Sequence, residues 1–301
     1  MRTIESVDST LIFDRSKKIR MHYLEIEEKY KDKPRHFRKE CPACNNKGFN
    51  YGFKKYEFHY VVCSNCSSLY LLDPIKENEH TKYSSDVEKS IYKSEEYKDY
   101  MSGVIEKLSF DIEIALNRFI DSKVPLNIGY YGSKNQYLFQ LIGKRNTKYV
   151  YNEIKIDINE KHDVIILNNI IESQIEPSTL LHKIHSKLNR GGIIYVTARL
   201  GSGIDIMTLW NNAFILPLQH VNLFSIEGIK ELFKPSFEIL EISTPGSLDI
   251  QNIADFNASD IPRIFTYMLQ HRGSSTLEEF QTFIQKNLLS SYLVMIARRG
   301  G

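Results

Sequence analysis

The chain has 301 residues, which is enough for one sizeable α/β core and a small additional module. Its 39 basic and 37 acidic residues leave a net charge of +2, which argues against a nucleic-acid partner. No apolar run approaches the roughly 20 residues that span a bilayer, and the N-terminus lacks the apolar centre of a secretory signal. We therefore expect a globular cytoplasmic protein without a membrane span.

Residues 1–40 form a polar N-terminal segment, in which residues such as Tyr23 and Ile26 are spaced to line one side of a short helix. The basic stretch 31–39 that follows has two interpretations, an anion-binding patch or a solvated linker. Charge runs usually belong to a solvated surface, so we expect the linker.

The strongest local motif lies in residues 41–73, where Cys41 and Cys44 form one C-x2-C pair and Cys63 and Cys66 form another. Two such pairs separated by 18 residues are typical of a zinc ribbon, in which four thiolates surround one Zn²⁺ ion. Because four cysteines fill the tetrahedral coordination sphere, the predicted zinc is structural and not catalytic.

Aromatic residues alternate along the segment between the two cysteine pairs, as they do in strands. Such residues either stack nucleic-acid bases or form a core, and a module of this size needs them for its core. We therefore expect packing rather than base stacking for Phe49, Tyr51, Phe53, Tyr56, Phe58 and Tyr60.

Residues 74–100 are rich in Lys, Glu, Ser and Tyr, and we interpret them as a linker with a surface helix that caps the site. An amphipathic helix is predicted over 103–120, because Ile105, Leu108, Ile112 and Leu116 share one face. The α/β domain is assigned to residues 101–301.

A short strand, a glycine-containing turn and a helix are predicted over 124–143, with Gly129 and Gly132 at the turn. The turn either lets the backbone approach a ligand or connects strand to helix without one. A second strand, 148–151, runs on to Glu153. A carboxylate at that point suits a ribose diol, because it accepts two hydroxyl hydrogen bonds.

A βαβ unit follows and is the most informative part of the chain. The apolar runs 164–167 and 193–196 are typical of strands buried on both faces of a parallel sheet. Between them, apolar residues recur at helical spacing from 177 to 188, and Gly191 and Gly192 are expected to end that helix.

Polar residues cluster just beyond these strands, where open α/β sheets bind their ligands. Asn168 and Glu172 follow the first strand, and Arg199 follows the second. His220 is expected on a loop over the same edge, where an imidazole is able to take a proton near neutral pH. The alternative for His220 is a structural hydrogen bond within that loop.

Four segments carry a family resemblance: D-V-I-I-L-N-N-I-I-E (163–172), K-L-N-R-G-G (187–192), H-V-N-L-F-S (220–225) and T-P-G-S-L-D (244–249). They resemble the second half of class I S-adenosylmethionine-dependent methyltransferases. The likeness is to bacterial members with an N-terminal zinc ribbon that act in sugar or surface-polysaccharide pathways, and it covers roughly residues 41–298.

The resemblance implies an α/β fold with a Rossmann-like methyltransferase sheet, S-adenosylmethionine as cofactor, and a small-molecule or sugar-nucleotide substrate. It also implies roles for seven residues. Cofactor binding falls to Gly129, Gly132, Glu153 and Asn168, substrate binding to Arg199, and catalysis to His220 and Glu172.

Three departures from the family pattern support an alternative function. Tyr130 and Tyr131 occupy the middle of the glycine turn, and Asn127 stands where an acid is common. Only nine residues lie between Glu153 and Asp163, whereas a parallel crossover needs about a dozen. The sheet is therefore either reduced there or connected in antiparallel fashion. The alternative is a catalytically inactive pseudo-methyltransferase that serves as a protein partner or sugar-binding module.

Overall fold

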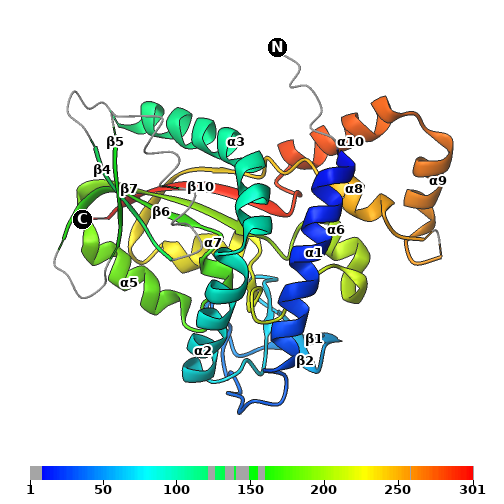
Figure 1. Cartoon of the computed structure of the whole chain (residues 1–301), viewed down its shortest axis with the longest axis horizontal. Helices are drawn as coiled ribbons and strands as arrows, with labels where there is room; N and C mark the ends of the chain where they lie inside the picture. Colours follow the sequence, from blue (N-terminus) through cyan, green and yellow to red (C-terminus); the bar gives the residue numbers. More distant parts are fainter. Residues whose placement is uncertain are drawn as a thin grey trace.

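Among the residues that the structure describes, the strands form two β-sheets, a central sheet of six strands and a smaller sheet of four (Figure 1). The computed structural model describes residues 9–120, 126–132, 139, 149–154, 160–257 and 259–300, with the backbone alone for 9–16 and 103–109.

The central sheet has its strands in the order β5 (Tyr149–Glu153), β4 (Leu126–Tyr130), β6 (His162–Asn168), β7 (Leu188–Arg199), β10 (Tyr292–Arg299) and β9 (Phe237–Ser243). The first four strands are parallel, and β10 runs antiparallel to both of its neighbours. The predicted fold class, an α/β protein with a Rossmann-like sheet and an N-terminal zinc-ribbon segment, is confirmed.

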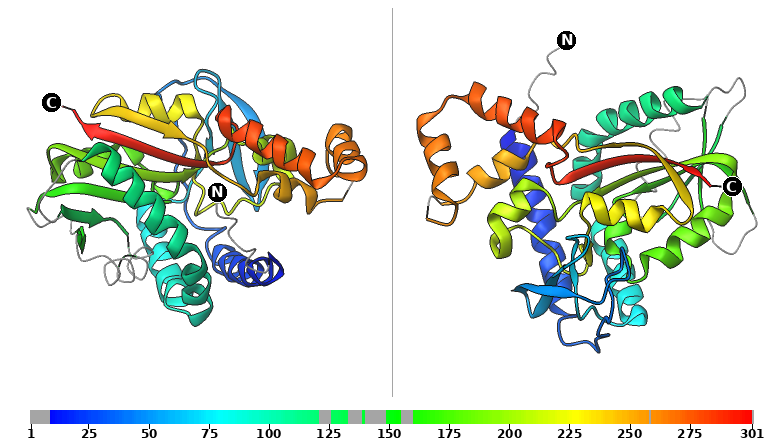
Figure 2. Two further views of the ribbon diagram at one scale, coloured as in Figure 1. Left: turned by 90° about the horizontal axis from the view of Figure 1, so that it is seen from above. Right: turned by 180° about the vertical axis from the view of Figure 1, so that it is seen from behind.

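Helices cover both faces of the sheet, and the main ones are α3 (Glu95–Phe119), α5 (Pro177–Lys187) and α7 (Ile226–Phe233). Because side chains alternate along a strand, Val164 and Ile166 of β6 join the core under α3, whereas Ile165 and Leu167 join the core under α5 and α7. Figure 2 shows α3 and α7 on opposite sides of the sheet. The continuous apolar run of β6 therefore reflects burial on both faces.

The predicted helix over 103–120 is part of the longer α3, in which Ile112, Ala115 and Leu116 are buried as expected. Ile105 and Leu108 lie outside the described side chains, so their predicted place on this face stays a prediction.

The central sheet is reduced between β5 and β6, which is one of the two possibilities that the short spacing left open. Both strands are parallel to β4, on either side of it, and only residues 154–161 separate them in the sequence. In the part of the chain that the structure describes, β5 is an edge strand. The antiparallel connection, the other possibility that the short spacing left open, is therefore wrong.

Gly191 does not end a helix, contrary to the prediction. Helix α5 ends at Lys187, and β7 begins at once with Leu188. Gly191 has a φ of +73° at an irregularity where the pairing of β7 with β6 shifts register. A side chain is disfavoured at such a φ, so this glycine serves the bend in the strand.

The small sheet joins the cysteine-bearing hairpin to the α/β domain. Its strands β1 (Phe49–Lys55), β2 (Phe58–Cys63) and β3 (Leu69–Leu71) are followed by β8 (Asn222–Leu223), which comes from beyond β7. Phe53, Phe58 and Tyr60 are buried as expected, whereas Phe49, Tyr51 and Tyr56 are exposed. The cysteine-bearing segment is therefore packed into the rest of the chain and shares its core.

The basic stretch 31–39 is not simply a solvated linker. Arg38 is 5% exposed, and its guanidinium donates to Asn222 Oδ1 at 2.7 Å and to the Ile175 carbonyl. Burial lowers the pKa of Arg38 to about 10. Charge runs are usually solvated, but this one supplies a buried connection between the small sheet and the loop before α5.

The remaining helices surround these layers. They are α1 (Ser9–Glu28), α2 (Glu77–Val87), η1 (Glu88–Tyr92), η3 (Ile171–Ser173), α6 (Ile204–Leu209), η4 (Trp210–Asn212), α8 (Asp249–Ala254), α9 (Arg263–His271) and α10 (Ser274–Lys286). Helices α8 to α10 form an extension on one side of the molecule (Figure 1). Among the described residues, no helix combines the length and the apolar character that crossing a bilayer requires.

Candidate functional site

The four predicted metal ligands meet at one end of the small sheet, with their sulfur atoms all within 4.8 Å of one another. The Asn65 amide and the Asn46 side-chain amide both direct N–H groups at the sulfur of Cys63, at 3.4 and 3.8 Å. Donors of this kind stabilise a metal-bound thiolate. The donor set therefore fits a tetrahedral Zn²⁺ ion, and its members are Cys41, Cys44, Cys63 and Cys66.

The cysteine cluster is tied to helix α7 through Ser225. Ser225 caps this helix, since its hydroxyl accepts a hydrogen bond from the Gly228 amide at 2.9 Å. The same hydroxyl donates to the carbonyl of Cys66, and the Ser225 amide donates to Ser68 Oγ at 3.1 Å. The metal site and the start of α7 therefore form one hydrogen-bonded unit.

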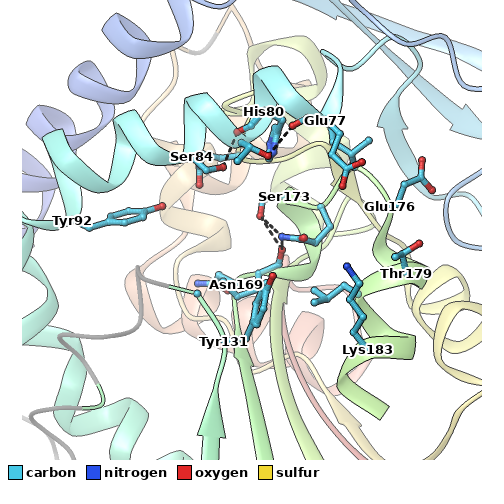
Figure 3. A pocket seen from close by; sticks show the side chains of 17 residues that line it. Glu77, His80, Ser84, Tyr92, Tyr131, Asn169, Ser173, Glu176, Thr179 and Lys183 are labelled. Atoms are coloured by element: carbon cyan, nitrogen blue, oxygen red, sulfur yellow. Dashed lines mark hydrogen bonds between the residues drawn. The ribbon is translucent and has the colours of Figure 1, made fainter. Parts of the chain in front are cut away.

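A pocket of about 310 Å³ opens at the carboxyl ends of β4 and β6 (Figure 3). Tyr131 and Gly132 follow β4, and Asn169 and Ile170 follow β6. The strand order reverses between these two strands, because β5 lies on one side of β4 and β6 on the other. Open α/β sheets bind ligands at such a reversal.

The roof of the pocket comes from α2, which presents Glu77, His80 and Ser84 to the cavity (Figure 3). His80 Nε2 lies 2.9 Å from the Leu218 carbonyl, which only accepts, so Nε2 carries the proton and Nδ1 keeps its lone pair. Burial lowers the pKa of His80, so the imidazole is neutral at neutral pH. The predicted capping helix therefore lies over the pocket.

The opposite wall comes from α5 and the residues before it. Figure 3 shows Thr179 and Lys183 rising from α5 on the side away from α2, with Glu176 beside them. Among the described residues, the charged groups that border the cavity are the ammonium group of Lys183 and the carboxylates of Glu77 and Glu176. This mixed lining fits a ligand that carries both signs of charge.

Of the predicted cofactor residues, Gly132 lines the pocket and Asn168 lies just behind it. Gly132 has a φ of +92°, and a Cβ there would come within 2.8 Å of Ile170 Cδ1. Asn168 is 5% exposed, and its Oδ1 accepts a 2.7 Å hydrogen bond from the Thr197 hydroxyl, which joins the ends of β6 and β7. Asn169, the next residue, is the one that reaches the cavity.

Gly129 and Glu153 lie near the pocket but outside its described lining. Gly129 is within β4, where a Cβ would approach Ile154 Cγ1 to 2.7 Å and His162 Cγ to 2.9 Å. Its small size therefore serves packing between strands. Glu153 is exposed at the end of β5, in register with Tyr130.

Glu172 lies in η3 and is 3% exposed. Its charge acts on Tyr92, one of the residues that line the pocket. Burial raises the pKa of Tyr92 to about 12, and the charge of Glu172 adds to the shift. The structure thus places Glu172 behind the pocket wall.

Arg199 sits at the end of β7, where the prediction put it, but it already has protein partners. Its guanidinium donates to the Phe214 carbonyl and lies 3.5 Å from the carboxylate of Asp205. Asp205 is 1% exposed, so the pair is anchored in the protein.

His220 is held by its own loop. Its Nδ1 accepts a 3.0 Å hydrogen bond from the Leu216 amide, and its carbonyl accepts from the Tyr60 hydroxyl at 2.8 Å. A neutral imidazole whose Nδ1 accepts carries its proton on Nε2. For His220 to act as a base, its Nδ1 must first leave the Leu216 amide, so this geometry favours the structural role.

We expect His220→Ala to lower the free energy of unfolding by about 1–3 kcal/mol, because the Leu216 amide loses its acceptor. His220→Asn, whose side-chain oxygen is able to accept the same bond, should recover part of the loss. Urea unfolding of the three proteins measures both effects. A catalytic base instead predicts normal stability and a roughly hundredfold fall in turnover. A fully stable and active His220→Ala protein contradicts both roles.

His80 is a pocket residue that the sequence patterns did not indicate. It stands in a segment rich in charge, and the opposite wall of the pocket, which includes Thr179 and Lys183, is distant from it in the sequence. The nearest signal is that Tyr83 and Val87, three and seven residues further along α2, are also buried, which marks one face of this helix as internal.

No protein-family profile and no curated protein sequence matches the chain. Among solved structures, similar ones include the Haemonchus contortus phosphoethanolamine N-methyltransferase 2 with phosphomonomethylethanolamine and S-adenosylhomocysteine. The identity is 12% over 77% of this chain and 63% of that chain, with a TM-score of 0.43. A chain of a complex with the Haloferax volcanii Trm112 methyltransferase activator is 10% identical over 74% of this chain and 98% of its own, with a TM-score of 0.43. The cyclase SpnF is 11% identical over 63% of this chain and 80% of its own, with a TM-score of 0.38.

Proposed function

We propose that this chain is an S-adenosylmethionine-dependent methyltransferase that holds its cofactor in the pocket between β4 and β6. The observation that carries the proposal is the position of the pocket, at the carboxyl edge where the strand order reverses. The resemblance of the segments after Asp163 to class I methyltransferases adds the identity of the cofactor.

The residues at this edge suit an adenosine with a charged sulfonium and amino-acid end. At Gly132 the backbone borders the cavity without a side chain, and Asn169 contributes a side-chain amide to the lining. Glu153, exposed at the end of the neighbouring strand, is proposed to accept the two ribose hydroxyl groups. Asn168 supports the wall through Thr197, and Gly129 keeps β4 close to its neighbours.

The bound cofactor would supply an activated methyl group, and the task of the protein is then to place an acceptor in line with it. We propose a small molecule of the sugar or surface-polysaccharide precursor class as acceptor, with Arg199 on its binding side. The catalytic roles predicted for His220 and Glu172 remain predictions. His80, whose neutral imidazole lies on the cavity roof with its proton on Nε2, is a further candidate to receive a proton, at Nδ1.

Titration calorimetry of the purified protein with S-adenosylmethionine and S-adenosylhomocysteine tests the proposal. We expect saturable binding of both at one site per chain. If neither ligand binds to the folded protein, the function to pursue is the inactive pseudo-methyltransferase that acts as a partner or a sugar-binding module. The short connection between β5 and β6 is the feature that favours that alternative.

A further inference from the structure

Three cations from separate parts of the chain converge on the loop 211–214. Arg20 of α1 lies over the ring of Phe214, with its Cζ atom 4.3 Å from the ring centroid. Arg199 of β7 donates to the carbonyl of the same Phe214. Lys55, at the end of β1, donates to two carbonyls of this loop at 2.8 and 2.9 Å.

The carboxylates near this cluster do not balance its charge. Asp205 lies 3.5 Å from Arg199. Within the described ranges, no carboxylate is within ion-pair distance of Arg20 or Lys55. Burial, and after it the charge of Arg199, lowers the pKa of both Arg20 and Lys55, whereas the exposed Asp255 acts in the opposite direction on Arg20. The charge of Arg199 thus acts unfavourably on both other cations.

Like charges gathered in a half-buried place raise the free energy of the folded protein unless an anion joins them. Two guanidinium groups and an ammonium group offer many N–H donors to such an anion, and the guanidinium fork matches the oxygen spacing of phosphate. Aromatic rings are close: Phe214 lies under Arg20, and the Tyr56 ring centroid is 5.5 Å from Lys55 Nζ.

We propose that Arg20, Lys55 and Arg199 form an anion subsite that binds a phosphate ester. The role of this subsite as the acceptor site of a methyltransferase rests on the proposed function. The binding of a phosphate ester by the three cations does not.

The subsite lies next to the pocket along the same edge of the sheet. Thr197 and Arg199 point to the same face of β7, because they are two residues apart in a strand. Thr197 is bonded to Asn168 at the end of β6, and the following Asn169 lines the pocket. In ideal strand geometry, Arg199 is about 7 Å beyond Thr197 along β7, and β7 is about 5 Å from β6. A cofactor in the pocket and an acceptor phosphate on the cations would be neighbours.

Calorimetric titration of the full chain with phenyl phosphate, in low salt and without cofactor, tests the subsite. We expect saturable binding at one site, weakened at least tenfold in Arg20→Gln and in Lys55→Gln. Two variants that remove the same charge nearby are matched controls: Lys54→Gln, whose lysine pairs with Glu57, and Lys18→Gln on the exposed face of α1. Both controls should bind as the parent does.

Circular dichroism of each variant confirms that it is folded before its affinity is compared. Equal weakening in the variants and the controls would overturn the proposal, since it would indicate general charge attraction. No binding of phenyl phosphate by the folded parent would also overturn it. Benzoate provides the carboxylate counterpart, and tighter binding of benzoate would reject phosphate as the ligand class. Phenyl phosphate binding without S-adenosylmethionine binding would leave the subsite standing and refute the proposed function alone.

Discussion

Replacing Cys63 with Ser is expected to release Zn²⁺ from the purified protein and to unfold the small sheet. The parent should contain one zinc ion per chain, because the four sulfur atoms are placed to bind a single ion. Structural zinc contributes about 10–16 kcal/mol to the folding of small modules, which equals or exceeds the whole stability of many domains. The loss of one thiolate is therefore the most damaging change that we predict.

The damage should extend past the cysteine-bearing segment. Leu69 of β3 pairs with Leu223 of β8, and Ser225 links Cys66 to the first turn of α7. Metal analysis and hydrogen exchange measure the two effects, the second as faster exchange of the Gly228 amide. Exposed Asn50 on β1, changed to Ser, is the control and should keep the metal. A metal-free protein whose small-sheet amides stay protected would contradict the prediction.

The free energy of unfolding is expected to fall as the pH rises from about 5 to about 8, because of one buried carboxyl group. Glu27 is 3% exposed, and its Oε1 accepts from the Leu218 amide at 2.9 Å and from the Tyr83 hydroxyl at 3.3 Å. Within the described residues its Oε2 has no hydrogen-bond partner. Burial raises the pKa of Glu27 from 4.5 to about 8.

The direction of this change in the free energy of unfolding depends on which state, folded or unfolded, holds the Glu27 proton. Between the two pKa values the folded protein keeps the Glu27 proton and the unfolded chain has lost it, so each pH unit costs about 1.4 kcal/mol of stability. The loss reaches roughly 4 kcal/mol by pH 8. Glu27→Gln keeps an acceptor oxygen and does not titrate, so it should match the parent near pH 5 and exceed it near pH 8.

Urea unfolding at pH 5, 6.5 and 8 measures this difference. The control is Glu28→Gln, which removes the same charge from the adjacent exposed position. If the stability difference between Glu27→Gln and the parent does not change with pH, Glu27 is not a neutral buried acid in the folded protein.

The parts of the structure that the sequence predicted well depend on short-range patterns. The spacing of the four cysteines alone predicts their metal site. The continuous apolar runs at 164–167 and 193–196 likewise predict strands that are buried on both faces.

The parts that it missed depend on contacts between distant residues. Arg38 belongs to a charged stretch, and only the folded chain shows Asn222, far along the sequence, as its acceptor. Long-range contacts also determine β8, a two-residue strand, and the pocket position of His80, because other lining residues follow β4 and β6 or lie on α5. Arg199 was found as an edge residue, but Arg20 and Lys55 become its neighbours only through folding.

If the cofactor occupies the pocket between β4 and β6, a large side chain placed in that pocket should prevent its binding. Thr179 is exposed on α5 and lines the cavity, whereas the adjacent Ser178 is exposed and does not. Calorimetry with S-adenosylhomocysteine should find that Thr179→Trp has lost binding by a hundredfold or more, while Ser178→Trp binds like the parent. Equal affinity in the two tryptophan variants would contradict this position and place the cofactor elsewhere.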